Sequence, residues 1–295
     1  EQMRLGLRDI LGLVDYEQNL AELSALAEAC LQYGLEVVMR ENRLKQPPFA
    51  VIGLGKLGGQ EINYGSDLDL CFVTEAGAKR LPALQRFAAR LLELLSKRTE
   101  QGIVFVTDAR LRPDGEKGLL VNTLAAYEDY YRNRAQLWEI QSLTRTRAVA
   151  GDLGLGGKFH ALAARLTDFR ATSGILNPNR PGCWRPEWKR DVCEMRRRIE
   201  RERTPPGQDT LAIKTGAGGL MDGEFIAQAL CLENGWHEAH TLRALERGQA
   251  AGILPAGDKL LANYRQLRRV EGILRRWSYE GETVLPDDPA PYYRV

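Results

Sequence analysis

Two aspartates, Asp67 and Asp69, stand one residue apart where the apolar run "LDLCFVT" begins. Side chains at positions i and i+2 of a strand lie on the same face, so both carboxylates would face one side while Leu68 and Leu70 face the core. Like charges held side by side repel each other unless a cation neutralises them. The pair therefore predicts a site for divalent metal ions.

A third aspartate, Asp108, lies in the segment "IVFVTDARLRP", which is rich in β-branched residues. Two Mg²⁺ ions about 4 Å apart can bind the attacking and leaving oxygens of a phosphoryl or nucleotidyl transfer. Such a site needs a third carboxylate from another strand, and we assign Asp108 to it. Arg110 and Arg112 follow at strand spacing, so they would share the face of Asp108 and stabilise charge on a phosphate. The alternative for the two arginines is ordinary surface charge.

The segment before the aspartate pair, "GLGKLGGQEINYGS", is rich in glycine. Glycine has no Cβ, so the backbone N–H groups of such a loop can approach a triphosphate closely. The Ser66 hydroxyl, next to Asp67, can donate to the same phosphates. We therefore expect this loop to bind the nucleotide tail through Gly53, Gly55, Lys56, Gly58, Gly59 and Ser66.

Three other interpretations of this stretch fit less well. Its glycines match G-x-G-x-x-G, but a dinucleotide site needs a helix directly after them and an acid about 20 residues on, at the end of the next strand. Here the acids come about 14 residues after Gly53 and at the start of a strand. A P-loop is excluded because Lys56 is followed by Leu57 rather than by Ser or Thr. The aspartates could also simply cap a turn, although strands disfavour aspartate.

Hydrophobic periodicity, glycine and proline predict the elements that position these residues. The first half forms a small mixed β-sheet flanked by helices, and the second half is all-helical, so the fold class is α+β. We expect an N-terminal helical segment over 1–45, a core domain over 46–150 and a helical domain over 151–295. The expected helices are 1–45, 81–102, 123–151, 191–203 and several within 225–279; the expected strands are 49–55, 68–74 and 103–113; the expected loops are 151–158 and 173–186.

The bulk composition excludes several classes of protein. The 295 residues carry 41 basic and 39 acidic side chains, a net charge of +2, so no basic excess indicates nucleic-acid binding. Five dispersed cysteines without metal-ligand spacing predict reduced thiols in the cytoplasm. No apolar run approaches the roughly 18 residues of a membrane span, and no signal peptide opens the chain. The start at Glu1 and the end at "APYYRV" indicate a domain from a longer protein.

Two further clusters each leave two interpretations open. A second glycine-and-acid segment, "KTGAGGLMDGE" (214–224), either caps a helix through Asp222 or folds back over the site. Arginines at helical spacing with Glu271 among them are expected on a solvated face, with docking of a protein partner as the functional alternative. These arginines are Arg265, Arg268, Arg269, Arg275 and Arg276.

The glycine loop followed by S-D-x-D, with a third aspartate on a later strand, resembles the DNA polymerase β-like nucleotidyltransferase superfamily. The specific form "GLGKLGGQEINYGSDLDL" is similar to the glutamine synthetase adenylyltransferase/deadenylylase family. Further motifs of that family are "DARLRPDGEKGLLV", "WEIQSLTRTRAVAGD", "EMRRRIE" and "IKTGAGGLMDGEFIAQ", so the resemblance covers nearly the whole chain. It implies that the core domain is a nucleotidyltransferase.

Members of this family carry two such units, and this chain holds one copy of the motif. One unit transfers AMP from ATP to a tyrosine hydroxyl of glutamine synthetase, which regulates nitrogen assimilation; the other removes it by phosphorolysis and releases ADP. The motif "WEIQSLTRTRAVAGD" with Gln141 is similar to the adenylylating unit, whereas "IKTGAGG" is closer to the deadenylylating one. We expect the adenylylating activity, with deadenylylation as the alternative.

The resemblance also implies roles for residues and partners. Asp67 and Asp69 bind Mg²⁺, with Mn²⁺ as an alternative, and Asp108 completes the site and helps to deprotonate the tyrosine. ATP is the substrate nucleotide, glutamine synthetase the protein substrate and the PII signalling protein a possible regulator. A rival of another class is a non-catalytic regulatory module, but such a module has no reason to retain three mutually repelling acids.

Overall fold

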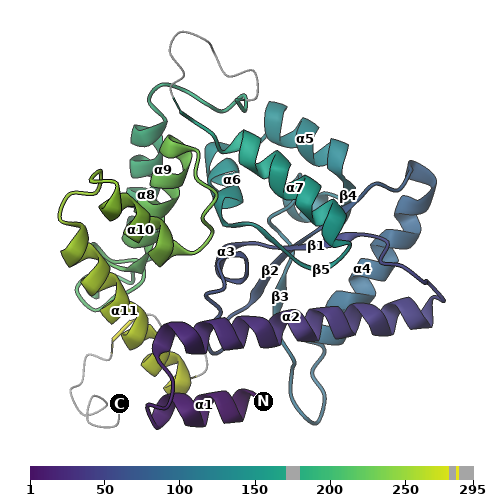
Figure 1. Cartoon of the computed structure of the whole chain (residues 1–295), viewed down its shortest axis with the longest axis horizontal. Helices are drawn as coiled ribbons and strands as arrows, with labels where there is room; N and C mark the ends of the chain where they lie inside the picture. Colours follow the sequence, from purple (N-terminus) through teal and green to yellow (C-terminus); the bar gives the residue numbers. More distant parts are fainter. Residues whose placement is uncertain (171–179, 279–283, 286–295) are drawn as a thin grey trace.

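A five-stranded mixed sheet lies at the centre of the computed structural model, which describes residues 1–170, 180–278 and 284–285 (Figure 1). Strand β1 pairs antiparallel with β2 on one edge and with β5 on the other. Strands β3 and β4 both pair in parallel with the remaining edge of β2, β3 at its start and β4 at its end. The strands are β1 (Ala50–Gly53), β2 (Leu68–Thr74), β3 (Thr107–Asp108), β4 (Val121–Thr123) and β5 (Arg147–Gly151).

Helices cover both faces of this sheet because its central strands are apolar on both sides. In β2, Leu68, Leu70 and Phe72 join one hydrophobic cluster, whereas Cys71 and Val73 join a second one. Helices α2 and α4 complete the first cluster, and α5 and α7 contribute to the second (Figure 1). These helices are α2 (Tyr16–Glu41), α4 (Leu81–Ser96), α5 (Leu124–Asn133) and α7 (Leu153–Leu166).

The second half is helical in the described residues and packs against the sheet-containing half. Helices α9, α10 and α11 share a third hydrophobic cluster, while Leu232 of α9 belongs to the second cluster beneath the sheet. Helix α11 returns to the N-terminal region, where Gly272 lies so close to the ring of Tyr16 that a Cβ would be 2.5 Å from it. The helices are α6 (Leu137–Ser142), α8 (Trp188–Arg203), α9 (Leu220–Asn234), α10 (Thr241–Ala250) and α11 (Gly257–Ser278).

The α+β fold class predicted from the sequence is confirmed, and β2 has the predicted bounds. The expected helix over 1–45 is instead two helices, α1 (Gln2–Ile10) and α2. The break arises because Asp15 is the N-cap of α2, with its carboxylate accepting the Gln18 N–H at 2.8 Å. None of the helices in the described residues has the length and apolar character that a membrane span requires.

The predicted strand over 103–113 was too long, because only Thr107 and Asp108 are in β3. After Asp108 the chain turns: the Arg112 N–H donates to the Arg110 carbonyl at 2.8 Å, and Asp114 has a φ of 59°. The helix predicted over 81–102 also ends earlier, at Ser96. Both differences follow from turns formed by local hydrogen bonds.

The prediction of helix throughout 123–151 was wrong at its end. Residues 147–151 form β5. This strand pairs antiparallel with the edge of β1 that does not pair with β2, and Ile52 is the partner of Ala148. The prediction of a loop over 151–158 was also wrong, since Asp152 caps α7 by accepting the Leu155 N–H at 2.9 Å. Gly156 lets α7 lie against the sheet, because a Cβ there would be 2.4 Å from that of Ala148.

Strand β4 was not predicted, and the one-turn helix α3 (Gly55–Gly58) follows β1 directly. The helix predicted over 191–203 is confirmed within α8, and α9, α10 and α11 account for the helices expected within 225–279. Of the loop expected over 173–186, residues 173–179 lie outside the described residues, and 180–186 have no regular structure.

Candidate active site

The three predicted aspartates come together at the edge of the sheet. The parallel register of β2 and β3 pairs Asp69 with Asp108, and Asp67 directly precedes β2. One carboxylate oxygen from each residue lies within 4.8 Å of those of the other two. Leu68 and Leu70 are fully buried, so packing fixes which face of β2 carries the aspartates. We refer to Asp67, Asp69 and Asp108 as the acidic trio.

The acidic trio has the electrostatics of a cation site. Burial, reinforced by the charges of Asp67 and Asp108, raises the pKa of Asp69 to about 7. Asp108 differs, because a hydrogen bond from Arg110 Nε at 2.8 Å holds its pKa below the usual range. Three carboxylates with one arginine among them retain excess negative charge, and their all-oxygen donor set suits Mg²⁺ or Mn²⁺. The residues present therefore fit a divalent metal ion.

Gly55 brings the glycine loop directly against the trio. Its φ is +54°, a conformation that side-chain-bearing residues rarely adopt, and a Cβ there would lie 2.7 Å from Asp69 Oδ2. The one-turn helix α3 begins at this residue. The absence of a side chain at Gly55 is therefore what allows the backbone to approach the carboxylate.

At three other glycines of the loop, a Cβ atom would collide with neighbouring parts of the protein. A Cβ on Gly58 would be 2.0 Å from the Arg145 carbonyl oxygen, and one on Gly53 would be 2.9 Å from the Val149 side chain. A Cβ on Gly59 would be 2.6 Å from the Ala239 carbonyl oxygen. These three glycines permit close packing of the loop onto the residues before β5, β5 itself and the segment before α10.

The side chains of Lys56 and Ser66 each bind another residue of the protein. The Lys56 ammonium lies 2.7 Å from Glu271 of α11, and burial lowers the pKa of Lys56 to about 8 although Glu271 opposes this. The Ser66 side chain is buried, and its hydroxyl oxygen accepts the Asn63 N–H at 3.1 Å. In this structure neither side chain is bonded to the acidic trio.

The two arginines after Asp108 have different partners. Arg110 lies beside the Asp108 carboxylate, as expected. Arg112 instead donates to the carbonyl oxygens of Ala109, Glu116 and Gly118 and so braces the loop that follows β3. The expected strand alternation fails for Arg112 because the strand ends at Asp108.

The family comparison now has a structural context. Residues 1–162 match the family model described as Glutamate-ammonia ligase adenylyltransferase, which is more than half of the chain. The chain belongs to this family. Residues 188–294 match a second model, described as GlnD PII-uridylyltransferase.

Curated relatives of this family member are bifunctional enzymes by name. A protein from Streptomyces avermitilis is 34% identical over 311 aligned residues, which cover 99% of this chain and 29% of the relative. A protein from Aromatoleum aromaticum is 37% identical, with 97% of this chain and 30% of the relative covered. Both are named "Bifunctional glutamine synthetase adenylyltransferase/adenylyl-removing enzyme". The chain spans about 30% of the length of these relatives.

A buried ionic cluster joins the glycine loop of this family member to its helical half. Glu61 pairs with Arg145 and accepts a hydrogen bond from the Thr241 hydroxyl at 2.9 Å. Glu271 is fully buried; besides Lys56 it binds Arg268 at 2.6 Å and Arg275 at 3.1 Å. We call these residues the ionic cluster: Lys56, Glu61, Arg145, Arg268, Glu271 and Arg275.

The prediction that the arginines of α11 lie on a solvated face was wrong for those that belong to the ionic cluster. Arg268 and Arg275 are buried, whereas Arg265 and Arg269 are exposed. The arginine spacing alone could not reveal this, because besides Glu271 the buried arginines bind the carbonyl oxygens of Glu61 and Tyr64, which lie some two hundred residues away in the sequence. The one available signal was Glu271, a single acid within an arginine-rich helix.

The segment 214–224 shows the helix-capping arrangement, one of the two interpretations that the sequence left open. Asp222, in the first turn of α9, accepts the Gly218 N–H at 2.6 Å and pairs with Arg196 at 2.6 Å, which is a capping arrangement. The charges of Arg145 and Lys214 oppose the rise in the pKa of Asp69 that burial and the other two carboxylates cause. The segment therefore caps α9.

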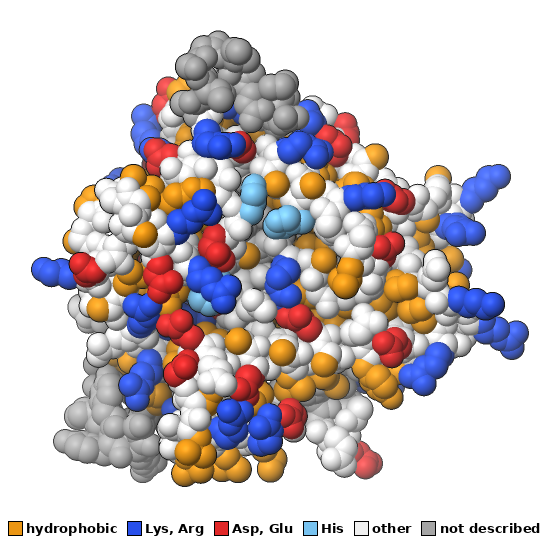
Figure 2. All heavy atoms as spheres, viewed as in Figure 1, with side chains coloured by type: hydrophobic (Ala, Val, Ile, Leu, Met, Phe, Trp, Pro, Cys, Tyr) orange, Lys and Arg blue, Asp and Glu red, His pale blue; other side chains and the backbone are white. Residues whose placement is uncertain are grey.

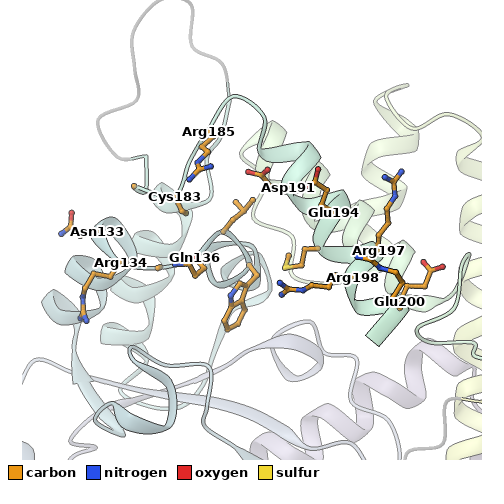
Figure 3. A pocket seen from close by; sticks show the side chains of 16 residues that line it. Asn133, Arg134, Gln136, Cys183, Arg185, Asp191, Glu194, Arg197, Arg198 and Glu200 are labelled. Carbon is orange, nitrogen blue, oxygen red and sulfur yellow. The ribbon is translucent and has the colours of Figure 1, made fainter. Parts of the chain in front are cut away.

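A cavity of about 1250 Å³ lies elsewhere, between the junction of α5 and α6 and helix α8 (Figure 3). Arg134 and Gln136 line it on the side of the α5–α6 junction, Glu194 and Arg198 line it on the side of α8, and no member of the acidic trio is among its lining residues. Over the face drawn in Figure 2, basic and acidic side chains are interspersed rather than segregated by sign.

Proposed function

We propose that this chain is an adenylylating unit that transfers AMP from ATP to a tyrosine hydroxyl of glutamine synthetase. The observation that carries the proposal is the acidic trio assembled beside Gly55 in a chain of this family. The relatives' names supply the protein substrate. Because those relatives are about three times as long, their activity is proposed for this chain and not assumed.

In this reaction the tyrosine oxygen attacks the α-phosphorus of ATP, and the bond from that phosphorus to the bridging oxygen of the β-phosphate breaks. Pyrophosphate leaves, and the phenolic proton passes to solvent. Divalent metal ions, when bound, would polarise the phosphates and lower the pKa of the attacking hydroxyl, which is ordinarily about 10. Asp67, Asp69 and Asp108 would hold them.

The pKa of Asp108 refines its proposed role. A carboxylate whose pKa is lowered by Arg110 is a weak proton acceptor but stays ionised at every physiological pH. Asp108 is therefore better suited to bind a metal ion than to retain the tyrosine proton. Arg110, exposed beside it, is available to a phosphate oxygen once a metal ion shares the Asp108 charge.

Phosphorolytic deadenylylation is the second candidate because the motif "IKTGAGG" favours it. Inorganic phosphate would attack the phosphorus of the AMP group on glutamine synthetase, the bond from that phosphorus to the tyrosine oxygen would break, and ADP and the free tyrosine hydroxyl would be the products. The motif that includes Gln141 favours adenylylation, and Gln141 is buried, donating to Gln228 of α9 at 2.6 Å. Both reactions would use the same acidic trio.

The assignment is tested by incubating the chain with α-labelled ATP, Mg²⁺ and unmodified glutamine synthetase. We expect label on glutamine synthetase and none when the chain carries Asp69→Asn. A parallel reaction contains adenylylated glutamine synthetase and inorganic phosphate; ADP formed only there would assign deadenylylation instead. If neither product forms, the chain is a non-catalytic module.

Three further proposals concern a regulator of the protein, its location and its domain boundaries. The PII protein is a proposed regulator because residues 188–294 match the PII-uridylyltransferase model. A cytoplasmic location is proposed because all five cysteines are free thiols. The domain division at 45 and 150 is proposed with one qualification: α7 packs on the sheet, so the core domain extends to about residue 166.

A further inference from the structure

The segment "IVFV", which leads into β3, exposes three of its four apolar residues. Ile103, Val104 and Val106 are 38%, 45% and 57% exposed, whereas Phe105 is buried in the first hydrophobic cluster. β3 is the terminal strand of the sheet path β3–β2–β1–β5. Exposed β-branched residues beside a terminal strand favour aggregation unless a partner covers them. The segment is therefore a candidate contact surface for another molecule.

Val106 lies on the face of the sheet that carries the acidic trio. Phe105 shares its hydrophobic cluster with Leu68, so by strand alternation Val106 faces the opposite side, where the trio lies. The Val106 carbonyl oxygen accepts the Leu68 N–H at 2.9 Å, which places Val106 beside the start of β2. Val106 and Val104 are two and four residues before Asp108, so their Cα atoms lie within roughly 7 and 14 Å of its Cα.

The two edges of β2 separate the glycine loop from this segment. Gly55 follows β1, which pairs with one edge of β2, whereas β3 pairs with the other edge. In an in-line transfer the attacking and leaving oxygens lie on opposite sides of the phosphorus. With the triphosphate tail along the glycine loop, the tyrosine would approach from the side of β3. Val106 is the exposed apolar residue on that side.

We propose that Val104 and Val106 contact the segment of glutamine synthetase that carries the reacting tyrosine. That segment is extended and has apolar side chains within about four residues of the tyrosine, because Val104 is four residues from Asp108. The contact serves adenylylation and deadenylylation alike, since both act on the same tyrosine. This inference rests on the proposed function, because it takes glutamine synthetase as the protein substrate.

The test compares the unsubstituted chain with the double variant Val104→Ser/Val106→Ser. Surface plasmon resonance measures the binding of unmodified glutamine synthetase in Mg²⁺ and α,β-methylene-ATP. We expect a roughly tenfold higher Kd for the double variant, because two apolar contacts are lost. In label-transfer assays the KM for glutamine synthetase should rise by the same factor, while the KM for ATP stays unchanged.

Ile253→Ser is the matched control, because Ile253 is also β-branched and 44% exposed but lies between α10 and α11. All variants should keep the Tm of the unsubstituted chain, since the substituted residues are exposed. An unchanged Kd in the double variant overturns the docking role, and the proposed function still stands if label is transferred. A raised KM for ATP also overturns it, because the valines would then contact the nucleotide. If the unsubstituted chain neither binds nor labels glutamine synthetase, the proposed function and this inference fail together.

Discussion

At Gly55 the backbone runs directly against the carboxylate of Asp69. Two constraints meet there: a left-handed φ of +54° and a Cβ position 2.7 Å from Asp69 Oδ2. A side chain would therefore have to displace the carboxylate or move the loop. This contact bears on the site because burial raises the pKa of Asp69.

We expect Gly55→Ala to reduce adenylyl transfer about a hundredfold, the effect of misplacing a reacting group by about 1 Å. The measurement is the initial rate of label transfer to glutamine synthetase. Gly157→Ala is the control, because a Cβ on that glycine of α7 meets open space. A rate for Gly55→Ala equal to that of the control would contradict the importance of the contact.

The raised pKa of Asp69 predicts that metal binding depends on pH. The carboxyl has a pKa of about 7 in the folded protein against an ordinary value of 3.8, so ionising it near neutral pH opposes folding. The metal-free protein therefore loses this contribution to stability as pH rises from about 4 to 7. A divalent ion relieves the repulsion, so Mg²⁺ should raise Tm more at pH 8 than at pH 6.

Thermal unfolding with and without Mg²⁺ at the two pH values measures this difference. The chain with Asp69→Asn should show a small Mg²⁺ effect that is the same at both. If Mg²⁺ raises the Tm of the unsubstituted chain more at pH 6 than at pH 8, the predicted pH dependence of metal binding is contradicted.

Residue spacing was sufficient to predict the trio but not the neighbours of each member. Asp67 and Asp69 could be predicted because alternation along one strand is local. The pairing of Lys56 with Glu271 could not, because it joins residues 215 positions apart and depends on the packing of α11. The bond of Gln141 to Gln228, 87 positions apart, likewise depends on how α6 and α9 pack.

At the scale of elements, α11 fixes the glycine loop through the ionic cluster. Its Glu271 is fully buried and forms ion pairs with Lys56, Arg268 and Arg275. Surrounding cations hold the pKa of Glu271 far below its usual range although burial opposes them. One carboxylate thus joins the helical half to the loop beside the trio.

We expect Glu271→Gln to lower the free energy of unfolding by about 3 kcal/mol or more, because it leaves buried cations without their counter-ion. Denaturant unfolding measures the change. Adding Lys56→Met to Glu271→Gln should recover part of the loss, since it removes one of the uncompensated charges. Glu246→Gln, which breaks an exposed pair with Arg265, is the control and should cost less than about 1 kcal/mol.

Element prediction succeeded where local signals agreed with tertiary packing. The apolar run of β2 and the amphipathic pattern of α8 gave the correct type of element. β5 was predicted as helix because "RAVAG" has good helix formers, and only the edge of β1 decides its conformation. The α11 arginines were placed in solvent because helical spacing does not reveal which face is covered.

At the scale of the whole molecule, both halves of the chain hold the glycine loop beside the acidic trio. The sheet edge carries the trio, and α11 anchors the loop through the ion pair of Glu271 with Lys56. Figure 1 shows α9 and α11 on the same side of the sheet as α3. The glycine loop therefore contacts both the sheet edge, at Asp69, and the helical half, at Glu271.

The most direct measurement is Mn²⁺ binding followed by electron paramagnetic resonance in the presence of α,β-methylene-ATP. The unsubstituted chain should bind Mn²⁺, and Asp67→Asn, Asp69→Asn and Asp108→Asn should each weaken binding at least about tenfold, since loss of even an outer-shell partner costs that much. Asp114→Asn is the control, because this exposed residue pairs with Arg134 outside the trio. Mn²⁺ affinities equal to that of the unsubstituted chain in all three trio variants would contradict the metal site on which the account rests.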